Sequence, residues 1–110
     1  MLKGKVVFVR CAFLRGNFPN DRFFVIRSEV GTELEGTASV DFCYTRDKTP
    51  LGDAPPAGQE VDGLVVGIVV GELQDGTLRL HLPDGEIYEL DEDYTVPVRP
   101  EGAGNVSVKS

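Results

Sequence analysis

The chain has 110 residues, of which 41% are hydrophobic and 26% are charged, and its formal net charge at pH 7 is −7. This length and apolar content are sufficient for one hydrophobic core, and they exclude an intrinsically disordered chain. No apolar run approaches the roughly 20 residues of a membrane-spanning helix, and residues 6–9 are too few for the apolar part of a secretory signal peptide. We therefore predict one cytoplasmic domain over residues 1–100, followed by a flexible tail over residues 101–110.

The first part of the chain predicts two strands. Residues 5–14 are rich in Val and Phe, which are typical of strands. Residues 22–27 form the second candidate, for which a short helix capped by Asn20 is the alternative. The adjacent β-branched residues Val25 and Ile26 favour the strand.

Residues 34–44 alternate strictly between apolar or small side chains at even positions and mostly polar ones at odd positions. This period of two predicts one strand with a single buried face, and it places Cys43 on the polar side. Cys43 and Cys11 lie far apart in the chain, without the spacing of a zinc site or a redox pair. Two interpretations therefore stay open: two reduced thiols, or a disulfide between neighbouring strands.

Residues 46–58 contain three prolines and two glycines, so we expect a long surface loop there. The next segment, residues 61–71, carries valines on both faces, which is typical of a central strand. Glycines recur in it at positions 63, 67 and 71 and therefore project to one face. Their spacing predicts a strongly curved strand that another backbone approaches closely.

Two Asp-Gly dipeptides, Asp75-Gly76 and Asp84-Gly85, predict tight hairpins in which both turn residues tolerate a positive φ. The strands around them should form a meander over residues 61–72, 77–82, 86–90 and 94–98. Pro97 has no N–H to donate, so the last strand is expected at an edge of the sheet. The alternation predicts that these apolar side chains are buried: Leu78, Leu80, Leu82, Val96 and Val98.

These patterns together predict an all-β protein, a small and strongly coiled antiparallel barrel of about six to seven strands. The run from Gly58 to Val98, with Gly-x-x-Val-x-Gly-x-Val-Val, Asp-Gly and Leu-Pro-Asp-Gly-Glu, resembles the SH3-like and OB-type barrels of translation factors, chromatin readers and accessory subunits. The resemblance covers about 40 residues and rests on pattern. It implies a barrel fold and a binding role.

Catalytic constellations are missing from the sequence. The single histidine, His81, is expected on the polar face of a strand, and nothing in the local sequence supports its pairing with Cys11 as base and nucleophile. An enzyme that uses Cys11 or His81 is therefore the weakest hypothesis. Motifs for nucleotides or metals are also lacking, so we expect no cofactor.

Charge is distributed unevenly along the chain. Residues 1–48 contain eight Lys and Arg against six Asp and Glu, a balance of +2, whereas residues 49–110 contain three against twelve, a balance of −9. The densest acidic group consists of Glu86, Glu89, Asp91, Glu92 and Asp93. It is either a solvated turn or a surface that docks a basic partner protein.

A second group combines arginine with phenylalanine in the first half of the chain, at Arg15, Phe18, Arg22 and Arg27. Such residues bind phosphates and stack bases in barrels that bind RNA or single-stranded nucleic acid. Alternatively, phenylalanines fill the core and arginines solubilise strand edges. We therefore predict a non-catalytic binding or accessory module that recognises another protein, with nucleic-acid binding as the alternative.

Overall fold

The computed structural model describes residues 4–27 and 33–98, so the predicted tail lies outside the described residues. Its elements are β1 (Val6–Arg15), β2 (Asp21–Arg27), β3 (Glu33–Ser39), η1 (Val40–Phe42), β4 (Cys43–Thr45), β5 (Val61–Glu72), β6 (Thr77–His81), β7 (Ile87–Asp91), η2 (Glu92–Tyr94) and β8 (Thr95–Pro97). The two η elements are single turns of 3₁₀-helix, and the all-β prediction is confirmed. None of the helical segments in the described ranges is long and apolar enough to cross a membrane.

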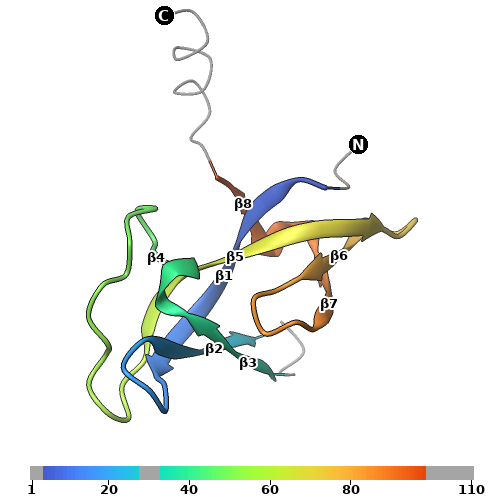
Figure 1. The fold of residues 1–110 in the computed structure, drawn as a ribbon. Coiled ribbons are helices and arrows are strands. Elements are labelled where there is room, and N and C mark those ends of the chain that lie inside the picture. Colours follow the sequence, from blue (N-terminus) through green and yellow to red (C-terminus); the bar gives the residue numbers. More distant parts are fainter. Residues whose placement is uncertain (1–3, 28–32, 99–110) are drawn as a thin grey trace, which may run out of the picture.

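Six strands follow one another across the sheet in the order β3-β2-β1-β5-β6-β7, and all neighbours are antiparallel. They curl through 285° into a half-barrel (Figure 1). The two short strands β4 and β8 lie beside β5 and β1. The predicted coiled antiparallel sheet is thus confirmed.

The long strands β1 and β5 form the centre of this sheet. They pair with each other from Val6 to Phe13. The other edge of β1 carries β8 near one end and β2 near the other. The other edge of β5 is likewise shared by β4 and β6. Each long strand therefore belongs to both halves of the curled sheet, and its curvature sets the shape of the molecule (Figure 1).

Glycines in β5 allow this curvature. A Cβ atom on Gly63 would lie 2.6 Å from a ring carbon of Phe13, and one on Gly67 would lie 2.8 Å from a methyl of Leu82. Atoms so close would have to move apart, so a larger residue at either position displaces the core. The pairing of β5 with β6 also shifts register between Val69 and Gly71, as at a β-bulge, which increases local twist.

The two hairpins after β5 share one construction. In the first, the Leu73 N–H donates to the Thr77 carbonyl at 2.8 Å, and Gly76 has a φ of 90°. The Asp75 side chain accepts from the Thr77 N–H at 3.0 Å. The second repeats this between Leu82 and Glu86, with Gly85 at a φ of 87°. In each loop only the glycine has a positive φ, which is typical of a three-residue hairpin loop. The prediction of a two-residue turn in which both Asp and Gly have a positive φ is therefore wrong.

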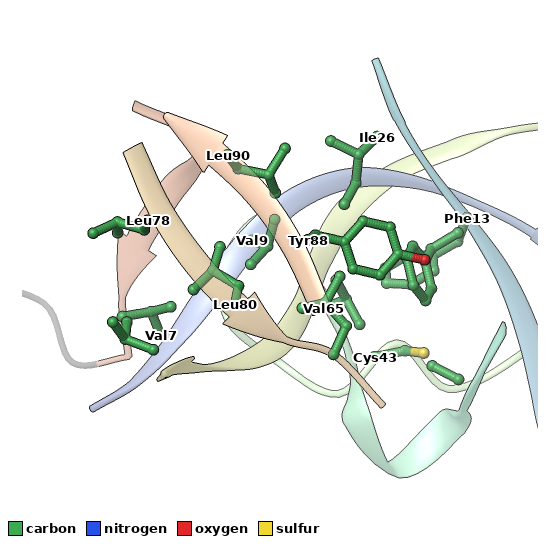
Figure 2. Packing of buried hydrophobic residues seen from close by; sticks show 14 residues of the cluster. Val7, Val9, Phe13, Ile26, Cys43, Val65, Leu78, Leu80, Tyr88 and Leu90 are labelled. Atoms are coloured by element: carbon green, nitrogen blue, oxygen red, sulfur yellow. The ribbon is translucent and has the colours of Figure 1, made fainter. Parts of the chain in front are cut away.

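The core lies on the inner, concave face of the half-barrel (Figure 2). Its buried members come from β1 to β7 and, for Leu82, from the position just after β6. They include Val9, Phe13, Phe24, Ile26, Val65, Val69, Leu80 and Leu82. The predicted burial of Leu78, Leu80 and Leu82 is confirmed. The prediction is wrong for Val96, which is half-buried, and for Val98, which is 39% exposed.

The position of β8 explains these two errors. Val96 pairs with Phe8, which lies outside the core cluster, so Val96 faces the outer, convex side of the sheet. Val98 lies one residue beyond the end of β8. Among the described strands β8 pairs with β1 alone, which confirms the predicted edge position of Pro97.

The segment over residues 34–44 also differs from its prediction. It divides at η1 into β3 beside β2 and β4 beside β5. The Ser39 hydroxyl accepts from the Asp41 N–H at 3.4 Å and caps this turn. Because the three-residue turn breaks the alternation, Cys43 points into the core and is only 1% exposed. By contrast, the strand prediction for residues 22–27 is confirmed by β2, and the helical alternative is wrong.

Both cysteines are free thiols. Cys11 pairs with Gly63 on one side of β5, and Cys43 pairs with Val65 on the other side. Their backbones are therefore two strand spacings apart, about 9.5 Å, which exceeds the reach of a disulfide. Burial raises the pKa of Cys43 to about 12, and it also raises the pKa of Cys11 above its ordinary value.

This burial predicts a loss of stability in alkali. The Cys43 thiol ionises near pH 9 in the unfolded chain but stays protonated to about pH 12 in the folded one. The free energy of unfolding that the buried, protonated thiol contributes is therefore complete below pH 9, and it falls as the pH rises toward 12. At pH 10 the loss from this thiol should be on the order of 1 kcal/mol. Urea unfolding at pH 7 and pH 10 measures it, and Cys43→Ala should show a smaller difference between the two pH values. An identical difference in both proteins would contradict the argument.

Candidate functional site

The predicted nucleic-acid residues Arg15 and Arg22 are brought together, because they pair across β1 and β2. Arg22 is only 4% exposed. Its guanidinium donates to three carbonyl oxygens, those of Pro19 at 2.8 Å, Asp21 at 2.7 Å and Gly52 at 2.9 Å. Its Nε is buried without a hydrogen-bond partner in the described residues. The Arg22 guanidinium therefore binds the backbone of the β1–β2 turn and of the loop after β4, and its N–H donors do not face solvent.

The other residues of this group differ in what they leave accessible. The Arg15 Nε donates to the Pro55 carbonyl at 3.2 Å, so both arginines hold the loop between β4 and β5. Arg27 forms ion pairs with Glu33 at 2.8 Å and Glu60 at 2.5 Å. Phe18 is 68% exposed in the β1–β2 turn. The arginine donors are thus largely engaged within the protein, and Phe18 is the exposed member.

The five predicted acidic residues are all exposed and are spread along β7 and η2. Glu89 lies 3.5 Å from Arg79 across the β6–β7 pair. Asp91 caps η2, because its side chain accepts from the Asp93 N–H at 2.9 Å. Glu86 follows the second hairpin, and Glu92 is the first residue of η2. No group of three or more metal-ligating side chains converges within the described ranges.

A row of exposed side chains crosses the outer face of four strands. Val6 pairs with Ile68, Ile68 pairs with His81, and His81 pairs with Ile87. Residues directly opposite in antiparallel strands share a face, so these four form one row. Val6 is 49% exposed, Ile68 41% and Ile87 51%. We call these three residues with His81 the outer row.

Sequence reasoning missed the outer row, although one signal for it was present. The strand that contains Ile68 is apolar on both faces, and the surplus face was interpreted as a sign of a central strand. Ile87 occupies the same alternating phase as the exposed Glu89. Which strands lie side by side decides whether these residues meet, and the pattern within one strand does not contain that information.

Cys11 and His81 lie on different parts of the sheet. Cys11 packs against the core cluster, whereas His81 is exposed on the outer face of β6. The strands β1 and β6 are separated by β5. Desolvation raises the pKa of Cys11, which disfavours the thiolate that a nucleophile requires. The two residues are not brought together as a catalytic pair.

Comparisons with protein-family models, with curated proteins and with solved structures find no match to this chain.

The buried guanidinium leads to a stability prediction. Arg22→Ala should lower the free energy of unfolding by about 2–4 kcal/mol, because three carbonyl oxygens lose a charged donor. Arg15→Ala, a matched change in the paired residue, should cost less than about 1 kcal/mol because that side chain is exposed. Arg22→Lys should recover only part of the loss, since an ammonium group lacks the planar fork. Urea unfolding measures all three. Equal losses for Arg22→Ala and Arg15→Ala would show that the buried contacts do not stabilise the fold.

Proposed function

We propose that the protein is a non-catalytic recognition module, and that the outer face of β1, β5, β6 and β7 docks another protein. The observation that carries this proposal is the outer row, in which Val6, Ile68 and Ile87 are 41–51% exposed, with Val6 opposite Ile68 and with the exposed His81 between Ile68 and Ile87. Exposed apolar residues are ordinary when they are scattered, whereas contiguous ones are typical of interaction surfaces.

Acidic side chains adjoin the outer row. Glu89 and Asp91 occupy alternate positions after Ile87 in β7, so their side chains point to the same face. An apolar centre with a charged rim is the usual composition of a protein interface. Arg79 lies beside Glu89, and with Asp91 the rim carries a net negative charge. This favours a partner whose apolar contact surface is bordered by Lys and Arg.

The fold supports the same proposal. A small half-barrel built on two long, strongly curved strands resembles the SH3-like and OB-type barrels, which commonly serve as binding modules. Nucleic-acid binding is supported less well. Arg22 is buried, and Arg27 is held by two carboxylates, so neither is free to neutralise phosphate.

The proposal is tested by quantitative capture from a cell extract, with nuclease-treated and untreated samples compared. The captured protein is identified and its dissociation constant is measured with purified variants. Ile87→Ser should weaken binding at least tenfold, because it removes an apolar contact at the centre of the interface. Leu73→Ser is the matched control, since Leu73 is 39% exposed in a hairpin away from the outer row, and it should bind normally.

Charge reversal separates this proposal from its alternative. Glu89→Lys with Asp91→Lys should mainly slow association, because rim charges govern encounter. Arg15→Ala should leave binding unchanged. If nuclease abolishes capture, and Arg15→Ala abolishes binding to an oligonucleotide at physiological salt, the surface around Phe18 binds nucleic acid and protein docking is wrong.

A further inference from the structure

A second feature of the outer face lies where β1, β5 and β8 meet. It is a hollow of about 330 Å³, lined among others by Arg10, Arg46, Asp62, Leu64 and Val96. This volume is at the lower end of the range of small-ligand sites. The hollow is separate from the outer row, since Arg10 lies four residues along β1 from Val6.

The apolar part of the hollow is built from the outer side of the sheet. Leu64 is only 4% exposed, and the ring of its cross-strand neighbour Tyr44 packs at a tilt of 50° against Phe8, with ring centroids 4.9 Å apart. Val96 pairs with Phe8 from the other side. A fixed apolar surface of this kind accommodates a short hydrocarbon group without rearrangement.

Two guanidinium groups border this apolar surface. Arg10 donates from Nη1 to the Asp93 carbonyl at 2.7 Å, which holds the group in place. A guanidinium has five N–H donors, and no carboxylate of the described residues lies within ion-pair distance of Arg10. Arg46 approaches Asp62 at 3.6 Å, longer than a charge-assisted hydrogen bond, with both side chains more than 70% exposed.

The charges of the hollow therefore leave one positive charge in excess, two guanidinium groups against the single carboxylate of Asp62. This excess occurs in a protein whose net charge is −7. A guanidinium matches a carboxylate in a planar, two-bond geometry. A carboxylate monoanion balances this excess of one positive charge, whereas a dianion would leave the hollow with a net negative charge.

We propose that this hollow binds a carboxylate attached to a short apolar group, with the carboxylate on Arg10 and Arg46 and the apolar group on Leu64 and Val96. Two sources supply this chemistry, namely a small organic acid and the C-terminus of a peptide that ends in an aliphatic residue. The site is independent of the docking proposal, because it uses none of the outer row.

The proposal is tested by titrations of the ¹⁵N-labelled protein, followed by amide chemical shifts. The probes are 4-methylpentanoate, its neutral amide, inorganic phosphate, a hexapeptide ending in leucine with a free carboxylate, and the same peptide as its C-terminal amide. At least one carboxylate probe should shift the amides around Arg10, Leu64 and Val96 in a saturable manner. Its amide counterpart should bind at least tenfold more weakly.

Variants assign the effect to the two guanidinium groups. Arg10→Gln should weaken carboxylate binding at least tenfold, and Arg46→Gln should weaken it severalfold because Arg46 also faces Asp62. Arg79→Gln is the matched control, since Arg79 is exposed on β6 beside Glu89, and it should bind normally. Unchanged spectra of each variant outside the hollow show that it is folded.

The outcomes decide between the sources and the proposal itself. Binding of the small acid identifies a small-molecule site, and binding of the peptide alone identifies the terminal carboxylate as the ligand. The proposal is overturned if phosphate binds as well as the acids, if the amides bind equally, or if no probe produces saturable shifts at the hollow. Loss of partner docking in the outer-row variants does not affect any of these readouts.

Discussion

The pairing of β1 with β5 is the constraint on which the rest of the structure depends. These strands are matched over eight residue pairs, from Val6 opposite Ile68 to Phe13 opposite Val61. Close approach requires glycine at position 63, where the Phe13 ring and the Tyr44 carbonyl occupy the space of a side chain. Each long strand then offers its second edge to two shorter strands. The curvature of the pair thus decides which segments become neighbours, and through them where the outer row and the hollow form.

A half-barrel leaves an opening between its first and last strands, and side chains close part of it. The Tyr88 hydroxyl, carried by β7, lies 2.5 Å from a carboxylate oxygen of Asp84 and 3.1 Å from the Glu35 carbonyl of β3. Burial and the neighbouring Asp84 raise the pKa of Tyr88, so the hydroxyl remains a donor. This hydroxyl, a single donor between two acceptor oxygens, links two edge strands that have no backbone pairing with each other.

Arginines in this protein have distinct tasks, and their partners separate those tasks. Arg22 and Arg15 bind backbone carbonyls of the loop between β4 and β5, and Arg27 and Arg79 pair with carboxylates. Arg10 is held by a carbonyl that leaves its charge uncompensated among the described residues. The arginine cluster in the sequence therefore does not include Arg10, the cation of the proposed carboxylate site, because burial and pairing depend on contacts distant in the chain.

The fold class and most strands could be predicted from the sequence, because alternation and Asp-Gly turns are local signals. The burial of Leu78, Leu80 and Leu82 followed from the same alternation. The predicted faces of Cys43 and Val96 are wrong. The 3₁₀ turn η1 changes the face on which Cys43 lies, and the pairing of β8 with β1 places Val96 on the outer face. The five acidic residues are exposed, as charged side chains usually are. The outer row and the hollow, by contrast, are produced by strands that are distant in sequence. Period within a strand does not predict which strands are neighbours.

The outer row is also the feature that folding alone explains least. A preference for strands does not by itself require Ile at positions 68 and 87. Thr prefers strands about as strongly, and its side chain would expose only one methyl group. Side chains that remain 41–51% exposed recover only part of the free energy of apolar burial. Exposed aliphatic residues on neighbouring strands also favour association with other chains. A protein surface that covers this row would bury the remaining area and remove that hazard, which is the physical reason to propose a recognition role for the outer row in particular.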